Sequence, residues 1–241
     1  MLVNADAKAL EWHSIVQLSQ DQTALEEFAQ KVDVHSVNQQ AFSLPSRLIA
    51  KTYLFRTIFN EGKGYAFTVD PNFMHVSTSV KYWEEVGEKF YEKYKGIKNI
   101  HTEWKRQVAS GLPLEGPSGR QWRYEMKPNW KGEMEWPVND LINHPVQGTG
   151  ADVMMLARLS LASRLKKLAN PEILMISTVH DSIVLDTPKQ HIPMLVELFH
   201  SVFDDLPKNI KKCWGYEWNT PLTCEVSVGP NMKDLEEISR S

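Results

Sequence analysis

The spacing of apolar and polar residues predicts helices interspersed with a few strands. Short apolar runs with the length and composition of strands occupy residues 2–6, 172–179, 182–186 and 221–228. Helical spacing is expected in the segments 21–31, 34–42, 46–60, 79–95, 99–110, 145–168 and 188–205. RQWRYEM, at residues 120–126, follows a turn and alternates like one more strand. We therefore predict an α+β fold with antiparallel strands.

Composition narrows the class of protein. The chain has 241 residues, of which 42% are hydrophobic and 24% charged, as expected of a soluble globular protein. Its two cysteines exclude a disulfide framework and a Cys-rich zinc site. No apolar run approaches the ~20 residues that cross a membrane, and no signal peptide is evident, so we expect a cytoplasmic protein without membrane contact, in the host cytoplasm if its source is viral. The formal charge of −3 neither indicates nor excludes nucleic-acid binding.

Two aspartates lie at or just beyond the ends of predicted strands. Asp181 lies at the tip of a strand–turn–strand, and Asp6 closes the strand VNAD. Asp is also a common turn residue, and a His-Asp pair occurs in metal-dependent phosphohydrolases, although their further ligands have no clear spacing here. On neighbouring strands, the two carboxylates could hold two Mg²⁺ ions roughly 4 Å apart, an arrangement used in phosphoryl transfer.

The predicted helix from Ser46 carries two cations followed by two aromatics. Arg47, Lys51, Phe55 and Phe59 are spaced four apart and therefore lie near one helix face. The cations suit a triphosphate and the rings suit a flat base. The alternative is an ordinary amphipathic helix. Because basic residues in a first turn oppose the helix dipole, an anionic partner makes better sense of them.

A polar and glycine-rich segment, NHPVQGTGAD, occupies residues 143–152, and Pro145 is expected to open a long helix. Asn143 and Gln147 are amides at i and i+4 that can reach the acceptors of a DNA minor groove. A helix cap with glycines spaced for packing explains the same residues equally well.

Six segments in this order resemble family A DNA polymerases, the bacterial DNA polymerase I type. Residues 3–21 resemble motif A, 47–59 resemble motif B, and 177–186 resemble motif C. The family's D-I-H segment, its N-A-P-x-Q-G-T-A-A-D segment and its C-terminal strand and tail resemble residues 33–36, 143–152 and 221–235. The resemblance covers essentially the whole chain, and the combination is far more specific than any one motif.

This resemblance implies a fold and an activity. The expected fold is a polymerase palm with an antiparallel sheet plus helical fingers, with the thumb and upstream palm absent. We expect palm at residues 1–33, fingers at 34–110 with the motif B helix at about 46–60, and palm again at 111–241. The implied activity is template-directed addition of dNTPs to a primer 3′-hydroxyl by two-metal phosphoryl transfer, with release of pyrophosphate. The implied partners are primer–template DNA and a dNTP.

The resemblance also assigns roles to single residues. Two Mg²⁺ ions would be bound by the carboxylates of Asp6 and Asp181 and by the backbone carbonyl of Ala7. Glu11 would be the gate that rejects a ribose 2′-hydroxyl. The residues that would face the nucleotide are Glu11, His35, Arg47, Lys51, Phe55 and Phe59, with Lys51 also counted as catalytic beside Asp6 and Asp181. The residues that would touch the primer–template are Asn143, Gln147 and His180.

The sequence departs from the family pattern at several positions. Phe59 replaces a Tyr, Arg56 replaces a Gly, and Ser182 replaces a Glu after the His-Asp pair. Lys8 adds a cation close to the metal strand. None of these changes removes a group that two-metal chemistry requires. The replacements at Phe59 and Ser182 slightly favour one alternative function, a non-catalytic DNA-binding or scaffolding half of a polymerase. The retention of Asp6, Asp181, Arg47 and Lys51 argues against it.

A second protein chain is a further expectation. The first methionine lies five residues before Asp6, and a strand at a chain start frays unless neighbouring strands hold it. We expect a split polymerase of phage type, in which a partner chain carries the thumb and the N-terminal palm. A shortened chain or a minimal enzyme would also account for a start so close to Asp6.

Overall fold

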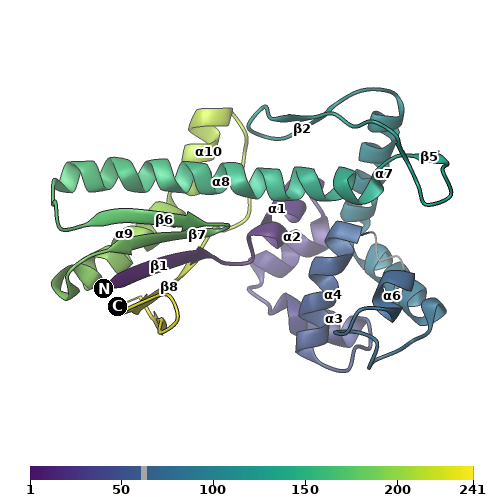
Figure 1. The fold of residues 1–241 in the computed structure, drawn as a ribbon, viewed down its shortest axis with the longest axis horizontal. Helices are drawn as coiled ribbons and strands as arrows, with labels where there is room; N and C mark the ends of the chain where they lie inside the picture. Colours follow the sequence, from purple (N-terminus) through teal and green to yellow (C-terminus); the bar gives the residue numbers. More distant parts are fainter. Residues whose placement is uncertain (61–63, 241) are drawn as a thin grey trace. The chain divides into compact units, whose positions relative to one another are not determined.

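The chain divides into two compact units, which are described separately below. The computed structural model describes residues 1–60 and 64–240, without the side chains of residues 58–60. Unit 1 comprises Met1–His13 and the chain from Gly148 onward, and unit 2 comprises Ser14–Gln147. Both units contain helices, and the longer strands lie in unit 1 (Figure 1). The predicted α+β class is confirmed, whereas the division into palm and fingers stays a prediction.

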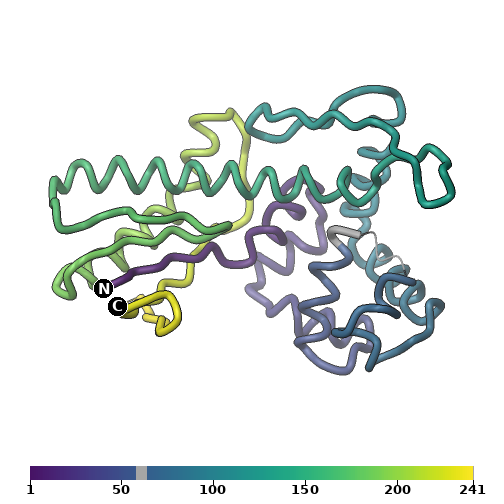
Figure 2. Tube along the Cα trace, viewed as in Figure 1, coloured from purple at the N-terminus to yellow at the C-terminus, as the bar shows by residue number. Residues whose placement is uncertain are grey.

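A five-stranded antiparallel sheet forms the centre of unit 1. Its strands lie in the order β6-β7-β1-β8-β9. The strand bounds are β1 (Leu2–Ala7), β6 (Leu174–Val179), β7 (Ser182–Asp186), β8 (Cys224–Gly229) and β9 (Glu236–Ile238). Figure 2 shows the purple start of the chain running between a green strand and a yellow one. The first strand of the sequence is therefore the central strand of the sheet.

Strand alternation gives this sheet one apolar face. Along β1, Val3, Ala5 and Ala7 are buried in a core cluster with residues of β7 and β8. The same cluster includes side chains of three helices, α8 (Val138–Leu168), α9 (Ile192–Asp204) and α10 (Leu206–Trp214). A short 3₁₀ turn, η1 (Lys189–His191), precedes α9. Because successive strand residues point to opposite faces, Asp6 lies on the face turned away from this core.

The first strand is held along both edges. It pairs with β7 from Leu2 opposite Asp186 to Asp6 opposite Ser182, and with β8 through Ala7. The Met1 amino group also donates to the Thr187 carbonyl at 2.8 Å, and the Thr187 amide donates back to Met1 at 3.0 Å. Strands from later in the sequence thus supply the support that a strand at a chain start needs.

Unit 2 is mainly helical. Its helices are α1 (Leu10–Ser19, which begins in unit 1), α2 (Gln22–Ala29), α3 (Val34–Ala41), α4 (Arg47–Asn60), α5 (Gly64–Thr68), α6 (Val80–Lys93) and α7 (Lys95–Ala109). Two short hairpins follow, β2 (Leu114–Glu115) with β3 (Gln121–Trp122), and β4 (Lys127–Pro128) with β5 (Met134–Glu135).

Buried rings fix α4 in unit 2. The Tyr53 ring stacks on Trp83 with centroids 5.9 Å apart, and Phe67 lies 5.0 Å from both rings. Phe73 packs edge-on against Trp83 at 5.4 Å. Aromatic contacts of this kind bury large areas in preferred geometries, so α4 is anchored by the face that carries Tyr53.

Several boundaries differ from the sequence predictions. The long helix α8 begins at Val138, after Pro137, and contains Pro145 within it instead of starting there. Of RQWRYEM, only Gln121–Trp122 forms strand. The sequence patterns missed α1, whose residues 12–17 are all buried, because a helix buried on most sides has no clear amphipathic period. No described helix combines the length and apolarity required to span a membrane.

Candidate functional site

A tight turn presents Asp181 beside the end of β1. Val179 pairs with Ser182, so His180 and Asp181 form a two-residue hairpin turn between β6 and β7. His180 has φ +53°, a left-handed conformation that is uncommon for a residue with a side chain. The Ala7 amide donates to the Asp181 carbonyl at 2.9 Å. The backbone therefore joins the segments that carry the two predicted metal carboxylates.

Negative charge accumulates around Asp6. The pKa of Asp6 is raised from 3.8 to about 6, first by burial and next by repulsion from the neighbouring Asp181 carboxylate. Glu225 and Glu11 add smaller contributions of the same sign. Glu225 stands opposite Asp6 in the β1–β8 register, and its carboxylate pairs with Lys8 at 2.7 Å. The cluster has more acids than bases and would favour a bound cation.

The donor set fits magnesium better than a metal that needs a protein cage. Within the described residues, no three His, Cys, Asp or Glu side chains are grouped to hold a metal ion. Mg²⁺ is commonly bound through one or two carboxylates, with water and substrate phosphates completing its octahedron. The repelling carboxylates of Asp6 and Asp181 match this pattern, and the Ala7 carbonyl belongs to the same strand end. Glu11 lies in the first turn of α1 and is partly buried.

In unit 2, the predicted phosphate-binding residues of α4 lie away from the aromatic core that contains Tyr53. Tyr53 and Leu54 are fully buried, whereas Arg47 and Lys51 are exposed and Phe55 is half-buried. Arg47, Lys51 and Phe55 are four residues apart and therefore share one helix face, which differs from the buried face of Tyr53 and Leu54. The side chain of Phe59 lies outside the described residues.

His35 lies close to this face of α4. It is buried on α3, and its ring centroid is 6.2 Å from that of Phe55. Burial lowers the pKa of His35, and the charge of Arg47 lowers it further, which favours a neutral imidazole at neutral pH. Its Nδ1 has no hydrogen-bond partner within the described residues. The structure thus brings together His35, Arg47 and Phe55, and Lys51 lies on the same face of α4.

The predicted DNA-facing amides lie in the first half of α8. Gln147 is exposed, and the buried Asn143 Oδ1 has no partner in the described part of the chain. Between them, the exposed His144 stacks on Tyr124 with ring centroids 5.8 Å apart. Both amides therefore retain unused hydrogen-bonding capacity, although His180, the third residue of this group, lies in unit 1.

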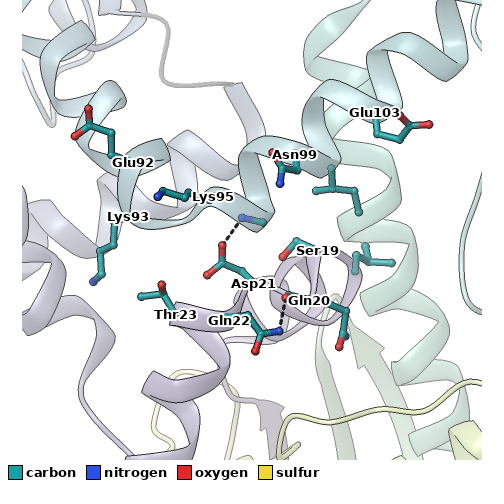
Figure 3. A pocket seen from close by; sticks show the side chains of 13 residues that line it. Ser19, Gln20, Asp21, Gln22, Thr23, Glu92, Lys93, Lys95, Asn99 and Glu103 are labelled. Carbon is teal, nitrogen blue, oxygen red and sulfur yellow. Dashed lines mark hydrogen bonds between the residues drawn. The ribbon is translucent and has the colours of Figure 1, made fainter.

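A cleft of about 750 Å³ in unit 2 contains none of the predicted residues (Figure 3). It lies where the start of α2 meets the start of α7. Asp21 accepts from the Ala24 amide at 3.0 Å and from the Gly96 amide at 2.6 Å. A Cβ on Gly96 would lie 2.7 Å from the Asp21 Cα, so only glycine fits this approach. The cleft is accounted for by helix packing.

The sequence analysis assigned no role to two residues of these sites. Glu225 joins the acidic cluster, and the alternation of strand 221–228 would have placed it on the polar face but not beside Asp6. Asp33 caps α3 and pairs with Arg47, with Nε to Oδ2 at 2.5 Å and Nη2 to Oδ1 at 3.0 Å. The sequence could have indicated a role for Asp33, because it stands just before a helix and two residues from His35.

Comparison with known proteins identifies the family of this chain. The model of DNA polymerase family A matches residues 1–234, so the chain belongs to this family. It is 25% identical over 251 residues to the thermostable DNA polymerase I of Thermus aquaticus. This alignment covers 98% of this chain and 27% of that protein. It is 23% identical over 219 residues to DNA polymerase I of Aquifex aeolicus, covering 87% of this chain and 36% of that protein.

A solved structure has the same fold. The POL domain of Pol1 from M. smegmatis, in complex with DNA primer–template and dNTP, superimposes with a TM-score of 0.76 at 19% identity. The match covers 95% of this chain and 39% of the other. The chain thus spans about a quarter to a third of the length of the two curated relatives above.

Replacement of Asp6 by Asn is expected to stabilise the protein. The folded state raises the pKa of Asp6, so between pH 3.8 and 6 it binds a proton that the unfolded chain has released. Ionised Asp6 therefore lowers the free energy of unfolding by its full amount above pH 6, and this loss disappears as the pH falls through the window. Without divalent cations at pH 7.5, Asp6→Asn should increase the free energy of unfolding by roughly 1 kcal/mol, after allowance for solvent screening.

Denaturant unfolding at pH 7.5 and pH 4 measures this effect. The gain should shrink at pH 4. The control Asp186→Asn removes a carboxylate of β7 that pairs with the Met1 amino group, and it should not stabilise. An Asp6→Asn protein less stable than wild type at pH 7.5 contradicts the repulsion argument.

Proposed function

We propose that this chain carries the nucleotidyl-transfer part of a template-directed DNA polymerase. It adds dNTPs to a primer 3′-hydroxyl and releases pyrophosphate. The observation that supports this most directly is the acidic strand end, where Asp6 and Asp181 repel each other beside a shared backbone hydrogen bond. A family match over residues 1–234 adds to it.

The acidic strand end would hold two Mg²⁺ ions through Asp6, Asp181 and the Ala7 carbonyl. When bound, such ions lower the pKa of an attacking hydroxyl and stabilise charge on the departing phosphates. The protein's own contribution is rigidity. Asp6 lies on the central strand and Asp181 lies on a two-residue turn, so the backbone holds the two residues beside each other. Glu11, in the helix that follows β1, would exclude a ribose 2′-hydroxyl.

The nucleotide would bind to one face formed by α3 and α4. Arg47 and Lys51 would contact phosphate oxygens, with a neutral His35 able to donate one further hydrogen bond. Phe55 would offer its ring face to the sugar and base. Asn143, Gln147 and His180 would contact the primer–template.

We also propose that a second chain, carrying the thumb and the upstream palm, covers the outer side of β6. Leu174 and Ile176 on this edge strand are 53% and 52% exposed. Leu159 of α8, also in unit 1, is 58% exposed. The outer edge of β6 has no strand partner within the described residues. An exposed apolar edge strand favours pairing with another chain.

Removing either metal carboxylate should abolish primer extension. Asp6→Ala and Asp181→Ala are each expected to lower incorporation of dNTPs by at least about a hundredfold, because the acidic strand end loses half of its carboxylate pair. Primer extension with Mg²⁺ measures this, and circular dichroism checks the fold. Asp186→Ala, at the other end of β7, should remain active. Near-normal extension by either site variant would overturn the assignment, and a wild-type protein that stays inactive even with the proposed second chain would favour the non-catalytic alternative.

Replacement of Glu11 by Ala should weaken discrimination against ribonucleotides. Loss of the side chain opens space at the sugar, so the dNTP/rNTP ratio of kcat/KM should fall by roughly tenfold or more. Glu225→Ala also removes a carboxylate near Asp6 and controls for charge, so its ratio should stay close to that of wild type. Equal changes in the two variants would argue against a steric gate.

The proposal of a second chain can be tested with the protein encoded immediately upstream of this chain's gene. Mixing the two purified proteins should produce a complex in sedimentation velocity and increase primer extension. Ile176→Lys should weaken this complex by roughly tenfold or more, since a charge would enter an apolar interface. Met232→Lys is the matched control, an equally exposed apolar residue (52%) of unit 1 away from β6. Full extension by the chain alone, with no complex, would exclude the proposal.

A further inference from the structure

The link between α3 and α4 is a bidentate ion pair between Asp33 and Arg47. Arg47 donates from Nε to Oδ2 at 2.5 Å and from Nη2 to Oδ1 at 3.0 Å. Arg47 is the first residue of α4, and Asp33 is the N-cap of α3. A two-point contact of this kind fixes the plane of a guanidinium as well as its position.

Asp33 is itself fixed by its own helix. Its Oδ1 accepts from the His35 amide at 3.3 Å, and its Oδ2 accepts from the Ser36 hydroxyl at 2.6 Å. The two oxygens of the carboxylate are therefore oriented by α3 independently of Arg47. Because His35 follows two residues later on the same helix, the pair joins two of the groups proposed to bind triphosphate.

Only one edge of the guanidinium is used. A guanidinium has five N–H donors, and Asp33 takes one from Nε and one from Nη2. The two N–H groups of Nη1 have no hydrogen-bond partner in the described part of the chain. The free edge is thus available to a second anion while the other edge is held.

The pair is too exposed to act mainly through stability. The side chains of Arg47 and Asp33 are 55% and 42% exposed, and exposed ion pairs contribute about 1 kcal/mol or less. The hydrogen bond from Arg47 nevertheless keeps the pKa of Asp33 well below its usual range, so the carboxylate remains ionised at any pH where the enzyme would work. A permanent and oriented contact with a small effect on stability points to a positioning role.

We propose that Asp33 is a positioning residue for nucleotide binding, which holds Arg47 by its Nε–Nη2 edge so that the Nη1 edge meets the triphosphate of the incoming dNTP. This inference rests on the proposed role of Arg47. Without Asp33, the long Arg47 side chain would have to be ordered when the nucleotide binds, and that ordering cost would weaken binding. The chemical step itself would be unaffected.

Asp33→Asn is the informative substitution. Asn is as good an N-cap as Asp, so α3 keeps its cap, but the carboxylate charge and one acceptor facing Arg47 are lost. The KM for dNTP should rise by roughly tenfold, with kcat within about twofold of wild type. Ser36→Ala is the matched control, because it removes a hydrogen bond to the same Oδ2 and leaves the Arg47 contacts in place. Its KM should change by less than about twofold.

A double-mutant cycle separates this idea from the proposed function. Arg47→Ala alone should raise the KM for dNTP, and adding Asp33→Asn to it should have no further effect. A rise of the same size in the Arg47→Ala background would show that Asp33 does not act through Arg47. An unchanged or lowered KM in Asp33→Asn would also overturn the inference, the latter by showing competition with the nucleotide. If Arg47→Ala leaves KM unchanged, the proposed nucleotide site itself is wrong.

Discussion

The hydrogen bonding of β1 along both edges is the constraint on which the acidic site depends. The strand pairs with β7 and β8, so Asp6 faces Ser182 on one side and Glu225 on the other. Burial of Val3, Ala5 and Ala7 against the helices leaves one orientation for Asp6, because a shift of one residue would turn it into the core. Apolar packing on one face thus determines where charge gathers on the other.

That charge is unfavourable for the folded protein. A pKa of about 6 at Asp6 means that its ionised form is opposed by burial and by the carboxylate of Asp181. His180, in the turn beside it, has a left-handed backbone that costs conformational energy. Both costs occur at one strand end of an otherwise well-packed sheet. Repulsion and strain held in place by a rigid framework are typical of sites that bind cations or react.

The second group of residues depends on a different kind of framework. In unit 2, stacked rings around Tyr53 and Trp83 fix one face of α4, and the Asp33–Arg47 pair ties its first residue to α3. Lys51 and Phe55 then follow from helical periodicity alone. Here the framework is local in sequence, whereas the acidic strand end joins the first strand of the chain to strands more than 170 residues later.

This difference explains what could be predicted. Strand 182–186 and the shared face of Arg47, Lys51 and Phe55 on α4 follow from short-range spacing along the sequence. The sequence alone determined these features, the α+β class and the family resemblance. Three features did not follow: the helix α1, the start of α8 at Val138 and the central place of β1. Burial on most sides of a helix, a proline tolerated inside a helix and long-range strand pairing have no local signal. Only the tertiary structure decided that Glu225 stands beside Asp6 and that Asp33 holds Arg47, since these contacts exist only after strands and helices have packed.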